Sequence, residues 1–228
     1  MPDDRPPIRI KICGCTDPAD FAEWKGSAVD AVGLNFFSGS KRYLAPERRR
    51  AVAEAIPVRL LRVGVFVNEM PEAIRQAAQE CGLDYVQLHG DEPPEVEAAL
   101  EGLPVIRAIR CVNSPQQAVE AYFRRNNAAG VPAAKTLLLD AYRPGAWGGT
   151  GATLPWDELE SLSADWPDVR WLLAGGLTPE NVAEAIEQAK PFGVDVAGGV
   201  EASPGHKEAA AVRRFSERAD AALRKQSR

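Results

Sequence analysis

The chain has 228 residues, of which 45% are hydrophobic and 26% charged, and its formal net charge is −5. This composition is typical of a globular protein. The acidic balance disfavours binding to nucleic acid or to a membrane surface, because both need a basic face, and no run of residues is apolar enough to predict a membrane span. The length is close to the roughly 250 residues of a complete (β/α)8 barrel, so we expect one domain over residues 1–228.

Four cysteines are scattered along the chain, at Cys13, Cys15, Cys81 and Cys111. This usage predicts no disulfide scaffold, and the cytoplasm is then the default compartment. Cys13 and Cys15 are too close together for the usual zinc spacing, and no second Cys/His pair follows, so we expect no metal site. Residues 1–7 are polar and proline-rich, which predicts a flexible N-terminus without a signal peptide.

Eight short apolar runs alternate with longer amphipathic stretches. Each run is rich in Val, Ile, Leu or aromatic residues and has the length of a buried parallel strand. The runs are Ile8–Cys13, Ala31–Phe36, Leu60–Val65, Tyr85–Leu88, Val105–Ile109, Thr136–Leu139, Val169–Leu173 and Gly193–Ala197.

The stretches between these runs predict helices. Apolar residues recur at helical spacing over Pro71–Cys81 and Glu180–Lys190, and Ser114-Pro115 is a start signal for another helix. Residues 125–134 predict an enlarged loop, and residues 208–228 a final amphipathic helix. Alternating strands and helices form either a doubly wound open sheet or a closed barrel. The count of eight, the even spacing and the absence of Gly-x-Gly-x-x-Gly after the first run favour an α/β fold of the (β/α)8 TIM-barrel type.

Chemistry in such barrels lies at the C-terminal ends of the strands, so the residues there are the candidates. Period-two alternation places Lys11 and Cys13 on one face of the first strand and Ile10 and Ile12 on the other. A cysteine is more often a small core residue than a catalyst on composition alone. The strand-end position of Cys13, beside Gly14, favours a general base, and a thiolate can accept a proton from carbon if nearby cations or helix N-termini lower its pKa from about 8.5.

Charged residues follow two other strands. Arg42 lies in the loop after the second run and is suited to holding a carboxylate with two hydrogen bonds. Asp140 comes directly after three leucines, and because an unpaired buried charge is costly, we expect it at the mouth of the barrel. Residues 143–151 behind it are glycine-rich and predict a mobile lid.

Paired glycines follow the seventh and eighth runs, as Gly175-Gly176 and Gly198-Gly199. Glycine lets backbone N–H groups approach a ligand closely. A phosphate site in the loops after strands seven and eight is a recurrent device of these barrels. The pairs therefore predict a phosphorylated small molecule as the ligand.

Together these residues resemble the phosphoribosylanthranilate isomerase family over nearly the whole chain, from Lys11 to about Lys207. The resemblance depends on the order and spacing of short motifs. They are Lys11-Ile12-Cys13-Gly14, Ser40-Lys41-Arg42-Tyr43, Val63-Gly64-Val65-Phe66-Val67-Asn68, Val86-Gln87-Leu88-His89-Gly90, Leu138-Leu139-Asp140, Gly148-Gly149-Thr150-Gly151, Gly175-Gly176-Leu177-Thr178-Pro179-Glu180-Asn181 and Val194-Asp195-Val196. Ala152, Pro155 and Gly198 depart from residues common in the family, and Gly198 replaces a serine, which would leave that phosphate contact to the backbone.

The resemblance implies an Amadori rearrangement of N-(5′-phosphoribosyl)anthranilate to 1-(2-carboxyphenylamino)-1-deoxyribulose 5-phosphate in tryptophan biosynthesis, without a cofactor. It implies that Asp140 protonates the furanose ring oxygen and that Cys13 removes the C2′ proton. Arg42 would hold the anthranilate carboxylate and the four glycines the phosphate. His89 and Asp195 are further candidates for lining the substrate, and Asp195 could equally pair with Lys11. A monomer or a homodimer is expected.

Other functions stay open at this point. A Schiff-base aldolase needs a lysine at an inner strand end, but Lys11 lies one layer deeper than Cys13 and Lys135 precedes its strand. A metal-dependent epimerase needs more ligands than His89 and His206. An isomerase serving both the histidine and tryptophan pathways would carry aspartates at both catalytic ends, which Cys13 disfavours. A non-catalytic barrel that binds a phosphorylated ligand is the alternative from another class.

Overall fold

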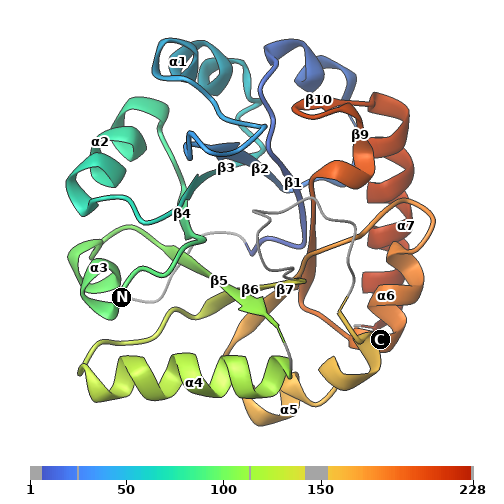
Figure 1. Cartoon of the computed structure of the whole chain (residues 1–228). Coiled ribbons are helices and arrows are strands. Elements are labelled where there is room, and N and C mark those ends of the chain that lie inside the picture. The colour runs from blue at the N-terminus through green and yellow to red at the C-terminus, as the bar shows by residue number, and fades with distance from the viewer. Residues whose placement is uncertain (1–6, 25, 113, 142–153, 227–228) are drawn as a thin grey trace.

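The computed structural model describes residues 7–24, 26–112, 114–141 and 154–226 (Figure 1). Nearly all of the predicted flexible N-terminus and all of the predicted lid, residues 143–151, lie outside these ranges. Among the described residues no helix is both long and apolar enough to cross a bilayer.

Eight parallel strands close into a barrel in chain order, and β8 pairs back onto β1, which confirms the predicted (β/α)8 architecture. All eight predicted runs form strands, with ends that differ from the prediction by at most two residues. The strands are β1 (Ile10–Cys13), β2 (Ala31–Asn35), β3 (Leu61–Phe66), β4 (Tyr85–Leu88), β5 (Val105–Cys111), β6 (Thr136–Ala141), β7 (Arg170–Leu173) and β8 (Gly193–Val196).

Helices surround the barrel in the same order, as the colours in Figure 1 follow one another around its axis. The α-helices are α1 (Pro46–Ala55), α2 (Pro71–Cys81), α3 (Pro94–Ala99), α4 (Pro115–Ala128), α5 (Leu162–Asp165), α6 (Val182–Ala189) and α7 (Ala209–Gln226). Short 3-10 helices are η1 (Pro18–Trp24), η2 (Trp156–Leu159) and η3 (Gly198–Val200), and β9 (Glu201–Ser203) pairs with β10 (His206–Lys207) in a small antiparallel sheet.

Proline fixes where four of these helices begin. Pro46, Pro71, Pro94 and Pro115 occupy the first turns of α1 to α4, where a missing N–H costs nothing. The hydroxyl of Ser114 accepts a hydrogen bond from a backbone N–H of the first turn of α4, as its start signal predicts.

The predicted loop over residues 125–134 is wrong in its first part, because α4 continues to Ala128. The reason is a tertiary contact: Asn126 is fully buried, and its Nδ2 donates to Oε2 of Glu97 on α3 at 3.1 Å. The helix predicted over Glu180–Lys190 begins later, at Val182, because the Asn181 side chain is bonded to the preceding loop.

Side chains divide into a helix-facing layer and a barrel interior. Ile10 and Ile12 belong to the larger apolar cluster between strands and helices, as their alternation predicts. The interior holds a smaller apolar cluster, which includes Tyr85, Ile106 and Leu138. Each of these three strands continues two residues further with an inward-facing residue that is less apolar or smaller, so the interior becomes more polar toward the C-terminal mouth.

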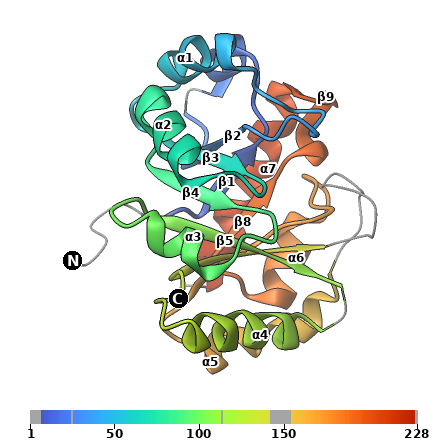
Figure 2. The same ribbon diagram turned by 60° about the vertical axis from the view of Figure 1, so that its left-hand side comes forward.

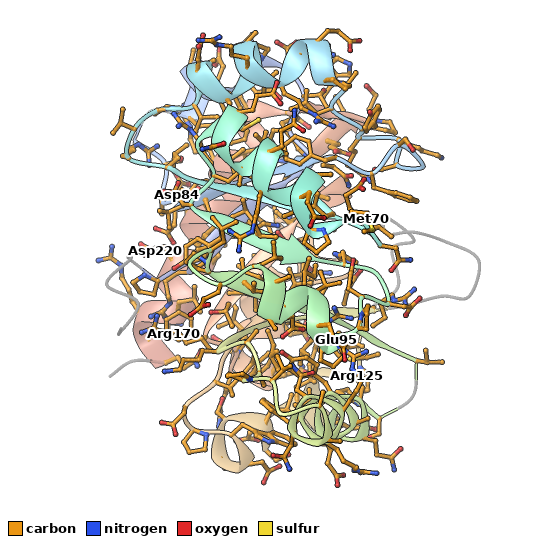
Figure 3. The ribbon with its side chains drawn as sticks, turned by 90° about the vertical axis from the view of Figure 1, so that its left-hand side faces the viewer. Met70, Asp84, Glu95, Arg125, Arg170 and Asp220 are labelled. Atoms are coloured by element: carbon orange, nitrogen blue, oxygen red, sulfur yellow. The ribbon has the colours of Figure 1, made fainter. Side chains whose placement is uncertain are left out.

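The strand starts and the strand ends lie on opposite sides of the molecule, so the more polar end of the barrel interior can be located in the figures. Asp84 and Arg170, at the starts of β4 and β7, lie on one side of the molecule in Figure 3, and Met70, after β3, lies on the other. Figure 2 shows the barrel obliquely, in a view between those of Figure 1 and Figure 3. The candidate residues all lie on the Met70 side, where the strands end.

Candidate active site

A cavity of about 400 Å³ opens at the C-terminal mouth of the barrel. This volume is suited to a small-molecule ligand. Every residue predicted for the site lines it, namely Cys13, Arg42, His89, Asp140, Gly175, Gly176, Asp195, Gly198 and Gly199. Residues from all eight strands or from the loops that follow them contribute to the lining, so the barrel topology itself brings these distant positions together.

Cys13 ends β1, is partly exposed as a residue and lines the cavity. Beneath it lies Lys11, whose side chain is fully buried and whose Nζ is 2.6 Å from Oδ1 of Asp195. Strand register explains the pair, since Lys11 and Asp195 are Cα partners on β1 and β8. Burial raises the pKa of the Cys13 thiol above its ordinary value, and the Lys11 ammonium opposes this rise without cancelling it.

Asp140 is the second-last residue of β6, within the strand and not after it as the sequence predicts. Its Oδ2 is 3.3 Å from Nε2 of His89, whose Nδ1 is 2.8 Å from Nε2 of Gln87. An amide nitrogen can only donate, so in this arrangement Nδ1 accepts and the Nε2–H of His89 donates to Asp140. Gly175 packs against the other oxygen, because a methyl group there would lie 3.1 Å from Oδ1.

Arg42 reaches the cavity from the loop after β2 across the end of β1. Gly14 makes this possible: its φ is +76°, and a Cβ there would lie 2.3 Å from Cδ of Arg42. The guanidinium bonds Glu201 through Nε at 2.7 Å and Nη2 at 2.6 Å. This uses one side of the planar fork, while the Nη1–Nη2 end can still hold a second anion with two hydrogen bonds.

Glu201 also binds Lys207, whose Nζ lies 2.6 Å from Oε1. The same Nζ donates to the carbonyl oxygens of Cys13 at 2.6 Å and Ala197 at 3.1 Å. Burial alone would raise the pKa of Glu201, but Arg42 and Lys207 together hold it below its ordinary range. Glu201 is therefore an anion that connects the arginine of the site to the ends of β1 and β8.

The glycine loops after β7 and β8 pack directly against each other. Gly175 and Gly176 have φ values of +90° and +63°, which favour glycine. A Cβ on Gly199 would lie 1.9 Å from the carbonyl oxygen of Leu177, so no side chain fits there. Asn181 fixes the first loop, since its Oδ1 accepts from the N–H of Thr178 at 2.8 Å and its Nδ2 donates to the carbonyl of Gly176 at 3.0 Å.

The packing of these loops gives a first prediction. Gly199→Ala must push the two loops apart, and if they hold the substrate phosphate, KM and the inhibition constant for inorganic phosphate should both rise about tenfold or more. Gly198→Ala is the matched comparison, because its methyl group would meet no backbone atom of the other loop and would lie 3.2 Å from Nη2 of Arg42 and 4.0 Å from Oε2 of Glu201. Its effect should be smaller, as steady-state kinetics will test. A larger effect at Gly198 would contradict this account of the loops.

The sequence prediction gives four further residues of the site no role in binding or catalysis. They are Lys11, Gln87, Glu201 and Lys207. Period-two alternation does place Lys11 below Cys13, and Gln87 below His89, on inward faces. Glu201 and Lys207 carry no such signal, because they belong to β9 and β10, which are too short to show periodicity. Across the described part of the chain, no group of three His, Cys, Asp or Glu residues is arranged to hold a metal ion.

Comparison with known proteins gives consistent matches. The family model described as N-(5′-phosphoribosyl)anthranilate (PRA) isomerase matches residues 10–218. The isomerase of that name from Geobacter sulfurreducens is 42% identical over 212 residues, which cover 93% of this chain and 98% of the relative. The one from Myxococcus xanthus is 45% identical over 209 residues, covering 91% and 94%.

Solved structures are similar over the same span. The phosphoribosyl anthranilate isomerase from Thermotoga maritima has a TM-score of 0.79 and 40% identity, covering 94% of this chain and 100% of its own. A structure of such an isomerase in complex with reduced 1-(o-carboxyphenylamino)-1-deoxyribulose 5-phosphate has a TM-score of 0.75 and 36% identity, with coverage of 94% and 100%.

Proposed function

The chain belongs to the N-(5′-phosphoribosyl)anthranilate isomerase family, and on this premise we propose that Cys13 is its general base and Asp140 its general acid. As a member of the family it is an isomerase of tryptophan biosynthesis. The observation that carries the assignment is that Cys13 on β1 and Asp140 on β6 line one cavity of about 400 Å³. An acid and a base at separate points of one small cavity can act on different atoms of one sugar.

The substrate has two anionic ends, and the cavity offers partners for both. The phosphate binds the glycine loops after β7 and β8, where backbone N–H groups can approach it closely. The anthranilate carboxylate binds the Nη1–Nη2 end of Arg42, whose orientation the bidentate contact with Glu201 fixes. Held at both ends, the ribose lies between Cys13 and Asp140.

Asp140 acts first, as the acid. It gives its proton to the furanose ring oxygen while the bond from that oxygen to C1′ breaks and the anilino nitrogen forms a double bond to C1′. The carboxylate that results needs a hydrogen-bond donor, and Nε2 of His89 lies 3.3 Å from Oδ2. His89 thereby stabilises the deprotonated acid, and Gln87 holds the imidazole in the required tautomer.

Cys13 acts second, as the base. Its thiolate removes the proton from C2′, and the electrons of that C–H bond move through C1′ to neutralise the iminium nitrogen. The enolamine then gains a proton at C1′ and loses the one on its C2′ hydroxyl, which yields the ketone. One carbon is oxidised and its neighbour reduced, so the rearrangement balances without an external oxidant.

Arg42→Ala tests the carboxylate contact. We expect KM for phosphoribosylanthranilate to rise about 10- to 100-fold with a smaller change in kcat, the size of one charged hydrogen-bonded contact. The control is the N-phenyl analogue, which lacks the carboxylate. Its KM should be nearly the same with both proteins, and inhibition by inorganic phosphate should persist. A large loss of phosphate inhibition would mean that Arg42 binds the phosphate instead.

The geometry weakens the competing functions. Lys11 is fully buried and paired with Asp195, which is unsuited to Schiff-base formation with an aldolase substrate. A binding barrel without catalysis would retain a substrate analogue but leave phosphoribosylanthranilate unchanged. The test is the loss of phosphoribosylanthranilate fluorescence on addition of the protein in EDTA. Binding of the reduced product analogue without turnover would overturn the proposal.

The assembly and the compartment complete the proposal. One similar solved structure is of monomers generated from the dimeric isomerase of Thermotoga maritima, which supports a monomer or homodimer for this chain. A cytoplasmic location is consistent with cysteines that are all free in the structure.

A further inference from the structure

The interior of the barrel contains a lysine that the proposed chemistry does not use. Lys11 is completely buried, and its ammonium lies 2.6 Å from Oδ1 of Asp195. A buried ion pair of this kind is weak evidence for stability, because well-packed apolar side chains in its place are often as stable or more so. The position of the pair, directly under the cavity, therefore calls for a functional explanation.

The ammonium also interacts electrostatically with Cys13. Burial alone would lower the pKa of Lys11, but Asp195 and Cys13, by charge and by hydrogen bonding, raise it above its ordinary value, so Lys11 stays charged. Burial raises the pKa of the Cys13 thiol, and among the neighbouring groups Lys11 opposes this rise most strongly. The other groups that act on Cys13 are Asp195 on β8 and Lys207 on β10. The charge of the Cys13 thiolate also acts on Arg42 and on Cys15.

Gly33 lies beside both the sulfur of Cys13 and the ammonium of Lys11. It is the Cα partner of Cys13 on β2. A methyl group at Gly33 would lie 2.7 Å from Sγ of Cys13 and 3.2 Å from Nζ of Lys11. Both side chains therefore lean into the hollow left by one missing Cβ, and any larger residue would separate them or push the sulfur away.

We propose that Lys11 is a positioning residue for the general base: its buried ammonium, held by Asp195, stabilises Cys13 as a thiolate at the cavity, and Gly33 leaves the room for this contact. Asp195 thus acts mainly through Lys11 and only secondarily as a wall of the cavity. The proposal rests on the assignment of Cys13 as the base, but the state of the thiol can be measured without turnover.

The test is the rate at which iodoacetamide alkylates Cys13 as a function of pH, followed by mass spectrometry. Only the thiolate reacts, so the pH midpoint reports the pKa of the thiol. The other cysteines are buried, and burial raises the pKa of Cys81 to about 11 and of Cys15 and Cys111 to about 12, which makes Cys13 the reactive one. Cys13→Ala provides the blank.

Three variants should shift the midpoint in a fixed order. Lys11→Met removes the cation and leaves the anion, so the midpoint should rise most, with alkylation near pH 7 slowed about tenfold or more. Asp195→Asn removes the anion, so the midpoint should fall below that of the wild type. The double variant removes both charges and should lie between the wild type and Lys11→Met. It also avoids an unpaired buried charge, which keeps the test decisive if Lys11→Met does not fold.

The outcomes separate this inference from the proposed function. Equal midpoints in the wild type and the double variant, or shifts of both single variants in the same direction, would overturn the role of Lys11. If the midpoints move as expected, the acid limb of the kcat/KM profile should move with them, and high pH should restore the rate of the double variant. Shifted midpoints with an unchanged kcat/KM profile would leave Lys11 as the partner of the thiol and remove Cys13 from the mechanism.

Discussion

Replacement of Cys13 by alanine should lower kcat by about 10²- to 10⁴-fold while the barrel stays folded, the usual loss for a positioned base. Alanine keeps the small size and the strand conformation but offers no atom that can accept the C2′ proton. Since burial raises the pKa of the Cys13 thiol, the base is protonated at low pH, and kcat/KM of the wild type should increase as the pH rises through that pKa. This limb of the profile should disappear with Cys13→Ala.

Cys15 provides the matched control. It lies two residues further along, is fully buried in the helix-facing cluster, and its Sγ is 3.6 Å from the carbonyl oxygen of Ile12. Cys15→Ala removes the same sulfur atom from a position that does not line the cavity, so kcat and its pH profile should be preserved. Equal losses in the two variants would point to general damage to β1, and full activity of Cys13→Ala would exclude the thiol as the base.

Replacement of Asp140 by asparagine should cause a loss in kcat of the same order, about 10²- to 10⁴-fold. Asparagine preserves the shape and can still accept a hydrogen bond from Nε2 of His89, but it has no acidic proton for the ring oxygen. The fold should be unchanged, because the carboxylate lies at the mouth and not in the apolar interior. Steady-state kinetics with circular dichroism as a check of folding will test this expectation.

The control is an aspartate at the other end of the barrel. Asp168 is exposed and precedes β7, remote from the cavity, so Asp168→Asn changes the net charge equally without touching the site. Its kcat should be that of the wild type. If Asp140→Asn retained full turnover, another donor would have to protonate the ring oxygen, and His89 would be the next to test.

The sequence allowed the barrel to be predicted because its strands are buried on both faces and read as separate apolar runs. Proline marks the helix starts, as at Pro71 and Pro115. Features that depend on tertiary contacts were missed. The last turn of α4 exists because Asn126 reaches Glu97, and β9 and β10 are held by contacts such as that between Glu201 and Lys207.

The positions of the candidate residues were predictable for a related reason. A closed parallel barrel brings all strand ends to one mouth, so chemistry-bearing residues there must meet. Their partners were not predictable, since they depend on contacts between segments far apart in the chain. The bidentate contact of Arg42 with Glu201 spans 159 positions. Lys11, set aside as too deep for an aldolase, was correctly placed in depth, and the register of β1 and β8 confirms its pairing with Asp195, which the sequence left as one of two possibilities.

The most direct test of Cys13 as the base and Asp140 as the acid is an isotope effect. Single-turnover loss of phosphoribosylanthranilate fluorescence would be compared for substrate with hydrogen or deuterium at C2′, in Cys13→Ala and in Asp140→Asn. We predict a full primary isotope effect with Cys13→Ala, because removal of the C2′ proton limits its rate. We predict almost none with Asp140→Asn, because ring opening limits that variant before the C–H bond breaks. The reverse pattern, or the same effect in both variants, would contradict the assignment of the base and the acid.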